Sequence, residues 1–406
     1  MEEKLKKYAS VILESCLKVE EGQPLFISAN KEVSDFVRIV ANKAYELGVK
    51  DIYFDIVDVY LKHDALVALD YEDLKNMSFW NKDKWNEYAK KGAAFVMLAS
   101  ENPGLMNDVD QEKLSKLTAY ALSTRKEFDN LRDKLIVPWT IAAVPTESWA
   151  KQVFPNSSKP EEDLWNKIFE ICAIDQEEPE KIWDEKISLL QERCNKMNEL
   201  KLKKLTYKNS LGTDFSIELL EKTIWCSGRE ELVNGKSVLV NYPTEEVFTS
   251  PSMNSANGIV YASKPLSYQD NLVKNFWIRF ENGKAVECSA EVGEETLKNL
   301  IKSCENADRL GEVALVQYDS PISNSNVLFY ETLFDENAAC HLALGDSFNE
   351  CLEGGIDMNK EQLLEEGLNK CDNHVDFMIG TSDLSIIGET YGGETIEIFK
   401  DGNFCI

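Results

Sequence analysis

Two of the three histidines in this chain of 406 residues, His341 and His374, stand close to acidic residues. In the segment NHVDFM (373–378), His374 and Asp376 alternate with apolar residues. Residues two apart in a β-strand point to the same face, so the imidazole and the carboxylate would share one face while the apolar side chains enter a core. An imidazole beside a carboxylate is a typical half-site for a first-row divalent metal ion. A solvated strand face would show the same pattern, and so short a match is weak by itself.

Three further acidic segments offer groups that would complete such a site. The segment 335–341 (DENAACH) has two acidic residues before a histidine, and 241–249 (NYPTEEVFT) has two adjacent glutamates in a loop near a proline. The segment 311–316 (GEVALV) places Glu312 at the start of an apolar strand. A carboxylate in that position is unfavourable unless it is paired or bound to a metal. Exposed carboxylates at strand ends are nevertheless common, so no single segment decides between a metal site and an ordinary surface.

The elements that would position these residues differ along the chain. Toward the N-terminus, apolar segments alternate with helical stretches, and a helical spacing from Val33 to Ala44 ends at Gly48. The predicted strands cover residues 25–29, 52–57, 94–99 and 135–137. Residues 160–201 have a helical pattern and are predicted to bridge two domains. Strands that alternate with helices predict a mainly parallel sheet covered by helices.

Antiparallel pairing is predicted from about residue 203 onward. Residues 203–207 and 214–219 flank a predicted turn, and Asn282-Gly283 joins two further strand-like segments, which is a strong hairpin signal. Because the chain is longer than one core usually supports, two domains are expected. We therefore predict an α/β domain over residues 1–200 and an α+β domain, rich in antiparallel strands, over 201–406 that carries the metal site.

Composition narrows the range of partners. The 71 acidic and 44 basic residues give a formal charge of −27, which argues against binding to nucleic acid or to an anionic membrane surface. No segment approaches the ~18 consecutive apolar residues of a membrane helix. The first residues, MEEKLKKYASVILESCL, are typical of an amphipathic helix and not of a signal peptide. We expect a cytoplasmic protein.

The ten cysteines are scattered from Cys16 to Cys405 without a C-x-x-C pair. In a chain of this length without a secretion signal, cysteines are usually reduced and often buried as small apolar residues. We therefore expect free thiols, and neither a disulfide framework nor a cysteine-zinc site.

Several of these segments together resemble the aminopeptidase T family of metallo-aminopeptidases. The segments that carry the resemblance are NYPTEEVFTSP (241–251), LGEVALV (310–316), LFDENAACHLALG (333–345) and NHVDFMIG (373–380). Weaker matches extend it over essentially the whole chain. The resemblance implies that the metal ligands are Glu246, Glu312, His341, His374 and Asp376. It also brings Glu336 into the site, where it is our first candidate for proton transfer to the leaving amine.

Three carboxylates and two imidazoles fit two closely spaced divalent ions better than one. Zinc, cobalt, manganese and magnesium all remain open as the metal. Water shared by two cations has a depressed pKa, which makes hydroxide available at neutral pH. The resemblance implies the hydrolysis of peptides with a free N-terminus, and a homodimer.

One position departs from the family pattern. Seven residues after His341 the family has a catalytic tyrosine, whereas this chain has Phe348. If the missing hydroxyl stabilises an oxyanion, its loss costs on the order of 10²–10³ in turnover, unless Ser347 or Tyr330 replaces it. An alternative is therefore a metal- or peptide-binding homologue with weak or no turnover. A two-metal hydrolase acting on another amide or on a phosphoester is less favoured, because the chain has no Gly-rich phosphate loop and no basic cluster beside the ligands.

Overall fold

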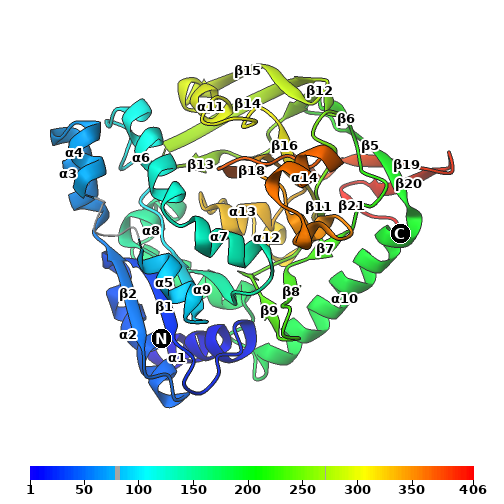
Figure 1. Cartoon of the computed structure of the whole chain (residues 1–406). Coiled ribbons are helices and arrows are strands. Elements are labelled where there is room, and N and C mark those ends of the chain that lie inside the picture. Colours follow the sequence, from blue (N-terminus) through cyan, green and yellow to red (C-terminus); the bar gives the residue numbers. More distant parts are fainter. Residues whose placement is uncertain (78–82, 270) are drawn as a thin grey trace. The chain divides into compact units, whose positions relative to one another are not determined.

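The computed structural model describes residues 1–77, 83–269 and 271–406. The chain forms two compact units, whose elements are labelled in Figure 1. The N-terminal unit comprises Met1–Ile187 and Gly228–Thr244, and the C-terminal unit comprises Ser188–Ser227 and Glu245–Ile406. The domain limits derived from the sequence, 1–200 and 201–406, stay a prediction.

A parallel sheet forms the centre of the N-terminal unit. Among the described residues its strand order is β10–β4–β3–β1–β2, and each neighbouring pair runs parallel. The strands are β1 (Leu25–Asn30), β2 (Ile52–Val57), β3 (Ala94–Ala99), β4 (Trp139–Ala143) and β10 (Asn241–Tyr242). A short antiparallel pair, β8 (Arg229–Glu231) and β9 (Ser237–Leu239), also belongs to this unit. The predicted α/β class with a mainly parallel sheet is confirmed.

Helices alternate with these strands. They are α1 (Glu2–Ser10), α2 (Ser34–Glu46), α3 (Val59–Ala68), α4 (Tyr71–Met77), α5 (Lys84–Lys90), α6 (Gln111–Ser123), α7 (Lys126–Asp133), α8 (Glu147–Val153), α9 (Pro160–Ile171) and α10 (Pro179–Leu200). Helix α10 continues into the C-terminal unit. Within the described residues, no helix has the length and apolar character needed to cross a membrane.

The strand predicted at residues 135–137 is wrong, because this segment ends helix α7. Leu135 N–H donates to the carbonyl of Arg132 (2.8 Å), and Ile136 N–H donates to that of Leu131 (3.0 Å). Leu135 has φ +54°, the left-handed conformation that often terminates a helix. A short apolar run cannot distinguish a strand from a helix end, and here the unsatisfied helix carbonyls determine the conformation.

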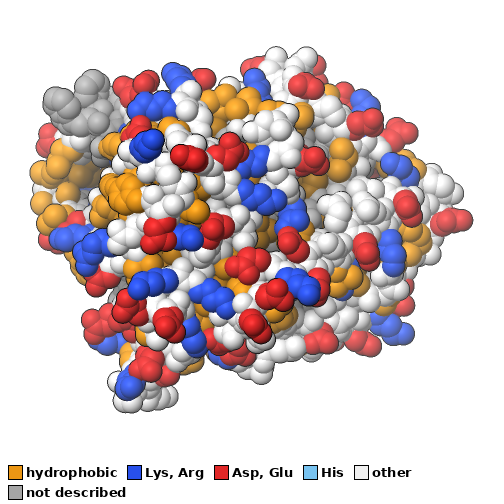
Figure 2. Space-filling view, turned by 90° about the horizontal axis from the view of Figure 1, so that it is seen from below, with side chains coloured by type: hydrophobic (Ala, Val, Ile, Leu, Met, Phe, Trp, Pro, Cys, Tyr) orange, Lys and Arg blue, Asp and Glu red, His pale blue; other side chains and the backbone are white. Residues whose placement is uncertain are grey.

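Charged side chains of both signs are interspersed over the face shown in Figure 2. Many of them pair along a helix, as Lys6 does with Glu2 and Lys116 with Glu112, each at 2.7 Å. Such exposed pairs contribute little to stability. They show that some of the 71 acidic residues of the chain are locally paired with basic side chains on the surface.

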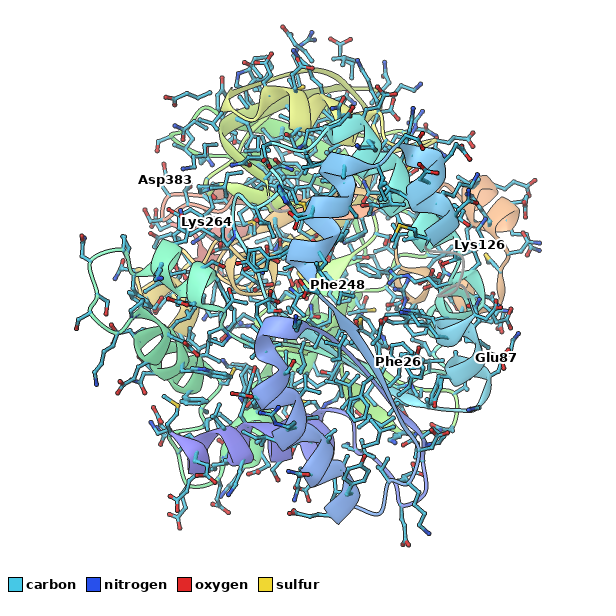
Figure 3. The ribbon with its side chains drawn as sticks, turned by 90° about the vertical axis from the view of Figure 1, so that its left-hand side faces the viewer. Phe26, Glu87, Lys126, Phe248, Lys264 and Asp383 are labelled. Atoms are coloured by element: carbon cyan, nitrogen blue, oxygen red, sulfur yellow. A yellow bond between two sulfur atoms is a disulfide. The ribbon has the colours of Figure 1, made fainter. Side chains whose placement is uncertain are left out.

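Aromatic side chains fill the core on one face of the parallel sheet. Phe26, labelled in Figure 3, lies in β1 with its ring centroid 4.9 Å from that of Phe95, 4.6 Å from Trp85 and 5.2 Å from Tyr53. Phe128 of α7 completes this cluster against Phe95 and Trp85. Because large aromatic side chains bury much apolar area, this cluster explains why strands β1 and β3 are almost continuously apolar.

Antiparallel sheets dominate the C-terminal unit. One has the order β18–β17–β16–β11–β7, and we call it the site sheet; the other has the order β13–β14–β12–β6–β5–β19–β20–β21, with β15 paired to β14. The strands are β5 (Leu202–Lys208), β6 (Asp214–Glu218), β7 (Cys226–Ser227), β11 (Val247–Thr249), β12 (Asn257–Tyr261), β13 (Leu266–Tyr268), β14 (Asn271–Glu281), β15 (Lys284–Val292), β16 (Leu310–Leu315), β17 (His341–Gly345), β18 (His374–Met378), β19 (Ser385–Thr390), β20 (Thr395–Lys400) and β21 (Asn403–Phe404). The helices are α11 (Glu294–Ile301), α12 (Pro321–Asn324), α13 (Thr332–Glu336) and α14 (Lys360–Glu366). The predicted antiparallel α+β character and both predicted hairpins, β5–β6 and β14–β15, are confirmed.

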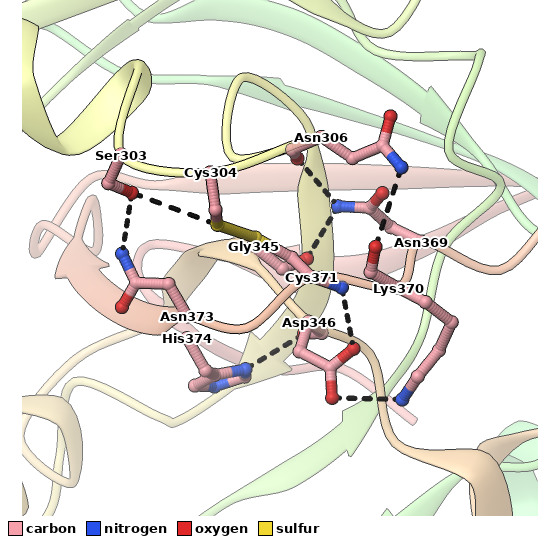
Figure 4. Close-up of a disulfide and its surroundings, with 10 residues drawn as sticks. All are labelled: Ser303, Cys304, Asn306, Gly345, Asp346, Asn369, Lys370, Cys371, Asn373 and His374. Atoms are coloured by element: carbon pink, nitrogen blue, oxygen red, sulfur yellow. Dashed lines mark hydrogen bonds and ion pairs between the residues drawn. A yellow bond between two sulfur atoms is a disulfide. The ribbon is translucent and has the colours of Figure 1, made fainter. Parts of the chain in front are cut away.

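A disulfide joins Cys304 and Cys371, which are 67 residues apart in sequence (Figure 4). The expectation that all cysteines are reduced is therefore wrong for this pair, whereas the other cysteines, all within the described residues, are free thiols. The fold brings the loop after α11 against the segment before β18. Spacing along the sequence does not reveal such a contact.

Candidate metal centre

The pairing of three neighbouring strands places four of the predicted ligands on one face of the site sheet. Directly opposite residues of an antiparallel pair share a face. Between β17 and β18, Gly345 lies opposite His374 and Ala343 lies opposite Asp376. Ala343 also lies opposite Glu312 across the β16–β17 pair. His341 is two residues from Ala343 on β17, so its side chain projects from the same face.

The fifth predicted ligand joins this face from the start of β11. Phe248 lies opposite Ala314, and Ala314 lies opposite His341. Glu246 comes two residues before Phe248 and directly precedes β11, so its side chain points to the side of His341. The small residues Ala343 and Gly345 leave room between the charged side chains.

The other face of the site sheet is a buried apolar layer. Its side chains are those of Val247, Val313, Leu315, Leu342, Leu344, Val375 and Phe377, which are all at most 8% exposed. Well-packed side chains of this kind have little freedom to shift. The candidate ligands therefore stand on a rigid support, which explains the alternation seen in NHVDFM.

The ligand atoms form two groups that share one carboxylate. The donor atoms of Glu246, Glu312 and His341 all lie within 4.8 Å of one another, and so do those of Glu312, His374 and Asp376. His341 Nε2 is 3.2 Å from a carboxylate oxygen of Glu246, and His374 Nε2 is 3.2 Å from one of Glu312. Each group has the mixed nitrogen and oxygen donors that first-row divalent ions accept.

Backbone carbonyls orient both imidazoles. His341 Nδ1 lies 3.1 Å from the carbonyl oxygens of Glu336 and Ala339, and His374 Nδ1 lies 2.8 Å from that of Asp346. A carbonyl can only accept, so each Nδ1 carries a hydrogen, and each Nε2 is turned toward the carboxylates, where it would offer its lone pair to a bound metal ion. This arrangement is usual for histidine ligands of metal ions.

The burial of so many carboxylates supports cation binding. Glu246 is 5% exposed, Glu312 is 3% exposed, and Asp376 Oδ1 is buried 3.3 Å from His374 Nε2. Burial raises the pKa of Glu312 to about 7, and the charge of Asp376 also raises it, whereas the His374 hydrogen bond opposes the shift. Buried carboxylates are unfavourable unless opposite charge compensates them. Three ligand carboxylates outnumber the two imidazoles, and the donor set mixes oxygen and nitrogen, so the residues present fit divalent cations.

Glu336 lies beside the ligands at the end of α13. It is 7% exposed, and Asn337 Nδ2 donates a hydrogen bond to its Oε1 at 3.3 Å. Burial, followed by the charges of Asp376 and Glu246, raises the pKa of Glu336 well above its ordinary value. Glu336 is in neither ligand group. A carboxyl group that tends to keep its proton beside the ligands can act as a proton donor.

Phe348 packs against a candidate ligand. Its ring centroid lies 4.9 Å from that of His374 and 5.1 Å from that of Phe248. Ser347, one possible replacement for the missing hydroxyl, is 3% exposed and donates its Oγ hydrogen to the carbonyl of Asn369 at 2.6 Å. The Ser347 hydroxyl is therefore already engaged. Tyr330, the other possible replacement, lies in the segment before α13 with φ +55°.

Two residues around the site, Lys370 and Asp346, were not identified from the sequence, whereas Asp335 belongs to the acidic segment 335–341 considered there. Asp335, next to Glu336, accepts backbone hydrogen bonds from Phe329 and Glu331, so it shapes the turn before α13. Lys370 is buried, and its Nζ contacts the carboxylate of Asp346 at 2.8 Å. A lysine and an aspartate 24 residues apart give no signal in the sequence, because the turn after β17 brings them together.

Comparisons with known proteins agree over the whole chain. The sequence profile of the family described as thermophilic metalloprotease (M29) matches residues 1–404. Aminopeptidase AmpS of Bacillus subtilis (strain 168) is 39% identical over 99% of this chain and 98% of its own. Aminopeptidase T of Thermus aquaticus is 34% identical over 100% of this chain and 99% of its own.

Solved structures extend the comparison to the fold. Wild-type AmpT from Thermus thermophilus superposes with a TM-score of 0.89 at 32% identity, and the match covers 100% of both chains. A 2,5-dihydroxypyridine dioxygenase from Pseudomonas putida KT2440 has a TM-score of 0.50 at 11% identity. The dioxygenase therefore shares the fold alone.

Proposed function

We propose that this chain, which belongs to the thermophilic metalloprotease (M29) family and is a metal-dependent aminopeptidase, removes N-terminal residues from peptides with a pair of divalent metal ions. The proposed ligands are Glu246, Glu312, His341, His374 and Asp376. The observation that carries the proposal is the membership of Glu312 in both ligand groups, since one carboxylate can bridge two neighbouring ions. Zinc, cobalt, manganese and magnesium are the candidate metals.

Divalent ions bound at such a site lower the pKa of water and polarise a carbonyl group. The chain's own contribution is to hold the five donors on a rigid sheet face and to fix each imidazole through its Nδ1 hydrogen. The burial of the ligands strengthens electrostatic interactions between the site and a substrate. A free α-amino group can bind a nearby carboxylate or coordinate a metal ion, whereas an acylated one cannot, so such a site would favour a free peptide N-terminus over a blocked one.

Glu336 is the residue that we assign to proton transfer. Its raised pKa favours the protonated carboxyl, and bound cations would oppose this rise by offsetting the charges of Asp376 and Glu246. A general acid works best when its pKa lies near the working pH. Glu336 would then deliver its proton to the nitrogen of the leaving peptide as the scissile bond breaks.

Phe348 supports a second candidate function. Its ring contacts His374 where the family supplies a hydroxyl, and the Ser347 hydroxyl is engaged elsewhere. A protein that binds metal and peptide with little turnover would keep the metal ligands and lack this hydroxyl, as this chain does. The two candidates share the same ligands, so metal binding alone does not separate them.

Activity measured after chelation tests the proposal. The protein is stripped of metal, resupplied with zinc, cobalt, manganese or magnesium, and assayed with aminoacyl-p-nitroanilides and with matched free and N-acetylated peptides. Metal-restored cleavage of the free peptides alone supports the aminopeptidase. Two bound ions without cleavage of any substrate would support the binding homologue. Cleavage that survives chelation contradicts a metal-dependent site.

We also propose that the chain works as a homodimer in the cytoplasm, as the family resemblance implies. Sedimentation equilibrium gives the test for assembly, since one chain has a mass of 46.1 kDa. A mass near that of one chain contradicts the dimer. Fractionation of cells that produce the protein, followed by detection in the soluble fraction, tests the location.

A further inference from the structure

We propose that residues 369–371, which we call the strap, position His374 for metal binding through the main-chain carbonyl of Asp346. The anchors of the strap are the Lys370 ammonium group and the Cys304–Cys371 disulfide (Figure 4). This inference rests on the proposed metal site and assigns Lys370 as a positioning residue. It further makes the affinity for one metal ion depend on the redox state of the disulfide.

The link between the strap and His374 is the carbonyl of Asp346. This oxygen accepts the Nδ1 hydrogen of His374 at 2.8 Å and so sets the direction of Nε2. Gly311 lies against the same carbonyl, because a Cβ built on residue 311 would stand 1.9 Å from the Asp346 oxygen. Gly311 is the bulge residue between Leu310 and Glu312. The Asp346 carbonyl therefore lies between the strand of Glu312 and the imidazole of His374.

Lys370 holds the turn that presents this carbonyl. Its Nζ lies 2.8 Å from Asp346 Oδ2, 2.9 Å from the Ser347 carbonyl and 3.1 Å from Asn349 Oδ1. These three acceptors match the three hydrogens of an ammonium group. A buried charge is favourable only with such compensation, so the contacts constrain the turn tightly. Cys371 N–H adds a bond to Asp346 Oδ1 at 3.0 Å, so both carboxylate oxygens are held.

The strap is also joined to the segment that leads into β16. Asn369 Nδ2 donates to the carbonyls of Gly345 (2.6 Å) and Asn306 (3.0 Å), and Cys371 is bonded covalently to Cys304. Figure 4 shows the disulfide, Lys370, Asp346 and His374 side by side. Glu312 follows this segment on β16, whereas His374 follows the strap on β18. The disulfide thus ties together the approaches to two ligands of one group.

Loosening the strap should weaken the binding of one metal ion more than that of the other. His374 and Asp376 belong to one ligand group only, whereas the other group, Glu246, Glu312 and His341, is linked to the strap through Glu312 alone, which follows the segment held by Cys304. Loss of a residue that orients a ligand typically weakens metal binding by about 10- to 100-fold. We expect this loss at the His374 ion, with a smaller loss at the other ion, which is linked to the strap only through Glu312.

Reduction of the disulfide by a water-soluble phosphine needs only the phosphine and one water molecule. The phosphine gives two electrons to the S–S bond and takes the oxygen of one water molecule to become a phosphine oxide. The two sulfurs each gain one of the protons of that water and become the thiols of Cys304 and Cys371. No other reactant is required.

The test measures zinc and cobalt affinities by calorimetry on the full chain, together with the cobalt absorption spectrum, which reports histidine coordination. The variants are Lys370→Met, Lys370→Arg, Asp346→Asn and Cys304→Ser/Cys371→Ser, and the controls are Lys298→Met and Cys405→Ser. Lys298 pairs with Glu294 on α11, and Cys405 is an exposed thiol. Alkylation followed by mass spectrometry establishes whether Cys304 and Cys371 are bonded.

We expect Lys370→Met, the double serine variant and the phosphine-treated native chain to bind one ion about 10- to 100-fold more weakly, with an altered cobalt spectrum. Lys370→Arg should retain part of the affinity, and both controls should match the native chain. Phosphine should not affect the double serine variant. If Lys370→Met does not fold, Asp346→Asn and the disulfide arm decide the question.

The inference is overturned if folded Lys370→Met and Asp346→Asn bind both ions normally, or if both ions weaken equally. Cys304 and Cys371 found as free thiols in the untreated protein overturn its redox arm. His374→Ala separates these failures from failure of the proposed function. If His374→Ala binds both ions as the native chain does, the metal site itself is wrong. If it loses one ion while the strap variants do not, only the strap inference fails.

Discussion

The parallel sheet of the N-terminal unit and the site sheet of the C-terminal unit differ in what their second face carries. In the parallel sheet, strands β1 and β3 are apolar nearly throughout, and aromatic side chains such as Phe26 and Phe95 cover one face. In the site sheet, one face is equally apolar, whereas the other holds five ionisable groups, of which Glu246, Glu312 and His341 are buried and His374 and Asp376 are partly buried. A buried sheet therefore packs apolar side chains in the N-terminal unit, whereas in the C-terminal unit it also brings ionisable side chains together on one face.

Because of this difference, the parallel sheet is stable without a bound ligand, whereas the charged face of the site sheet needs a compensating cation. Apolar burial stabilises the parallel sheet without any partner, by roughly 25 cal/mol for each Å² removed from water. Carboxylates buried on the site sheet are unfavourable until a cation compensates them. We therefore expect substitutions on the charged face to change metal binding and catalysis, and substitutions in the apolar cores to change stability.

The largest effect is expected for Glu312→Gln, since Glu312 belongs to both ligand groups. Loss of the shared carboxylate should weaken both ions and lower kcat/KM by on the order of 10³-fold or more, because metal ions contribute several kcal/mol of transition-state stabilisation. Glu246→Gln, which removes a ligand from one group, is the matched control and should weaken one ion selectively. If Glu312→Gln weakened only one ion, as Glu246→Gln is expected to do, Glu312 would not be shared.

Phe348→Tyr tests the charged face of the site sheet by adding a hydroxyl group beside it, whereas Glu312→Gln removes a ligand. A hydroxyl beside His374 should raise kcat by up to about 10²–10³-fold if it stabilises an oxyanion, with little change in metal affinity. Steady-state kinetics with each metal give the measurement. Phe404→Tyr, on a partly buried ring that packs against Phe399, serves as the control and should leave kcat unchanged. An unchanged kcat in Phe348→Tyr would show that this chain does not use the hydroxyl.

Gly311→Ala tests the backbone support of the charged face. The new Cβ would meet the Asp346 carbonyl at 1.9 Å, so either this carbonyl or the bulge must move. We expect metal affinity at the His374 group to fall by about 10-fold or more, as for the loss of other groups that orient a ligand. Gly392→Ala, whose Cβ would meet only the Thr390 hydroxyl at 3.5 Å, is the control. Similar metal affinities in the two variants would contradict the role of the Asp346 carbonyl.

The pH dependence of stability should separate the chelated protein from the metal-loaded one. Burial raises the pKa of Glu312 from 4.5 to about 7, so the folded chelated protein binds more protons than the unfolded chain in this range. Its stability should therefore fall as pH rises from about 4.5 to 7, by on the order of a few kcal/mol. Metal binding requires the ionised carboxylate, so the stabilisation by metal should grow over the same range. Tm values measured with and without metal that follow parallel pH curves would contradict this coupling.

The fold was accessible from the sequence where one local pattern determined one outcome. The alternation in β18, the hairpin at Asn282-Gly283 and the apolar strands of the parallel sheet were predicted correctly. The segment 135–137 was not, because the termination of α7 depends on backbone hydrogen bonds that an apolar run does not encode.

The candidate site likewise has features that the sequence predicts and features that it does not. Its five proposed ligands lie in recognisable segments, and the strand register brings them together. The shared role of Glu312 and the contacts of Lys370 with Asp346 depend on how distant segments pack. The Cys304–Cys371 bond was missed for the same physical reason, since contact across 67 residues leaves no periodic signal.

The smallest effect, and the sharpest test of the comparison, comes from truncating one aromatic ring in each unit. Phe26→Leu in the parallel sheet should lower the free energy of unfolding by about 1 to 3 kcal/mol, because it leaves a cavity in the aromatic cluster, without changing metal affinity. Phe276→Leu should lower it by a similar amount, but Phe276 packs against Phe377, which lies between Asp376 and Met378 on the apolar side of β18. A shift of that strand would reach Asp376, so we expect metal affinity to fall a few-fold in Phe276→Leu alone. Chemical denaturation and metal calorimetry on both variants provide the measurement. If neither variant changes metal affinity, the apolar layer does not hold the ligands in place, and the rigidity of the site must come from the turns around them.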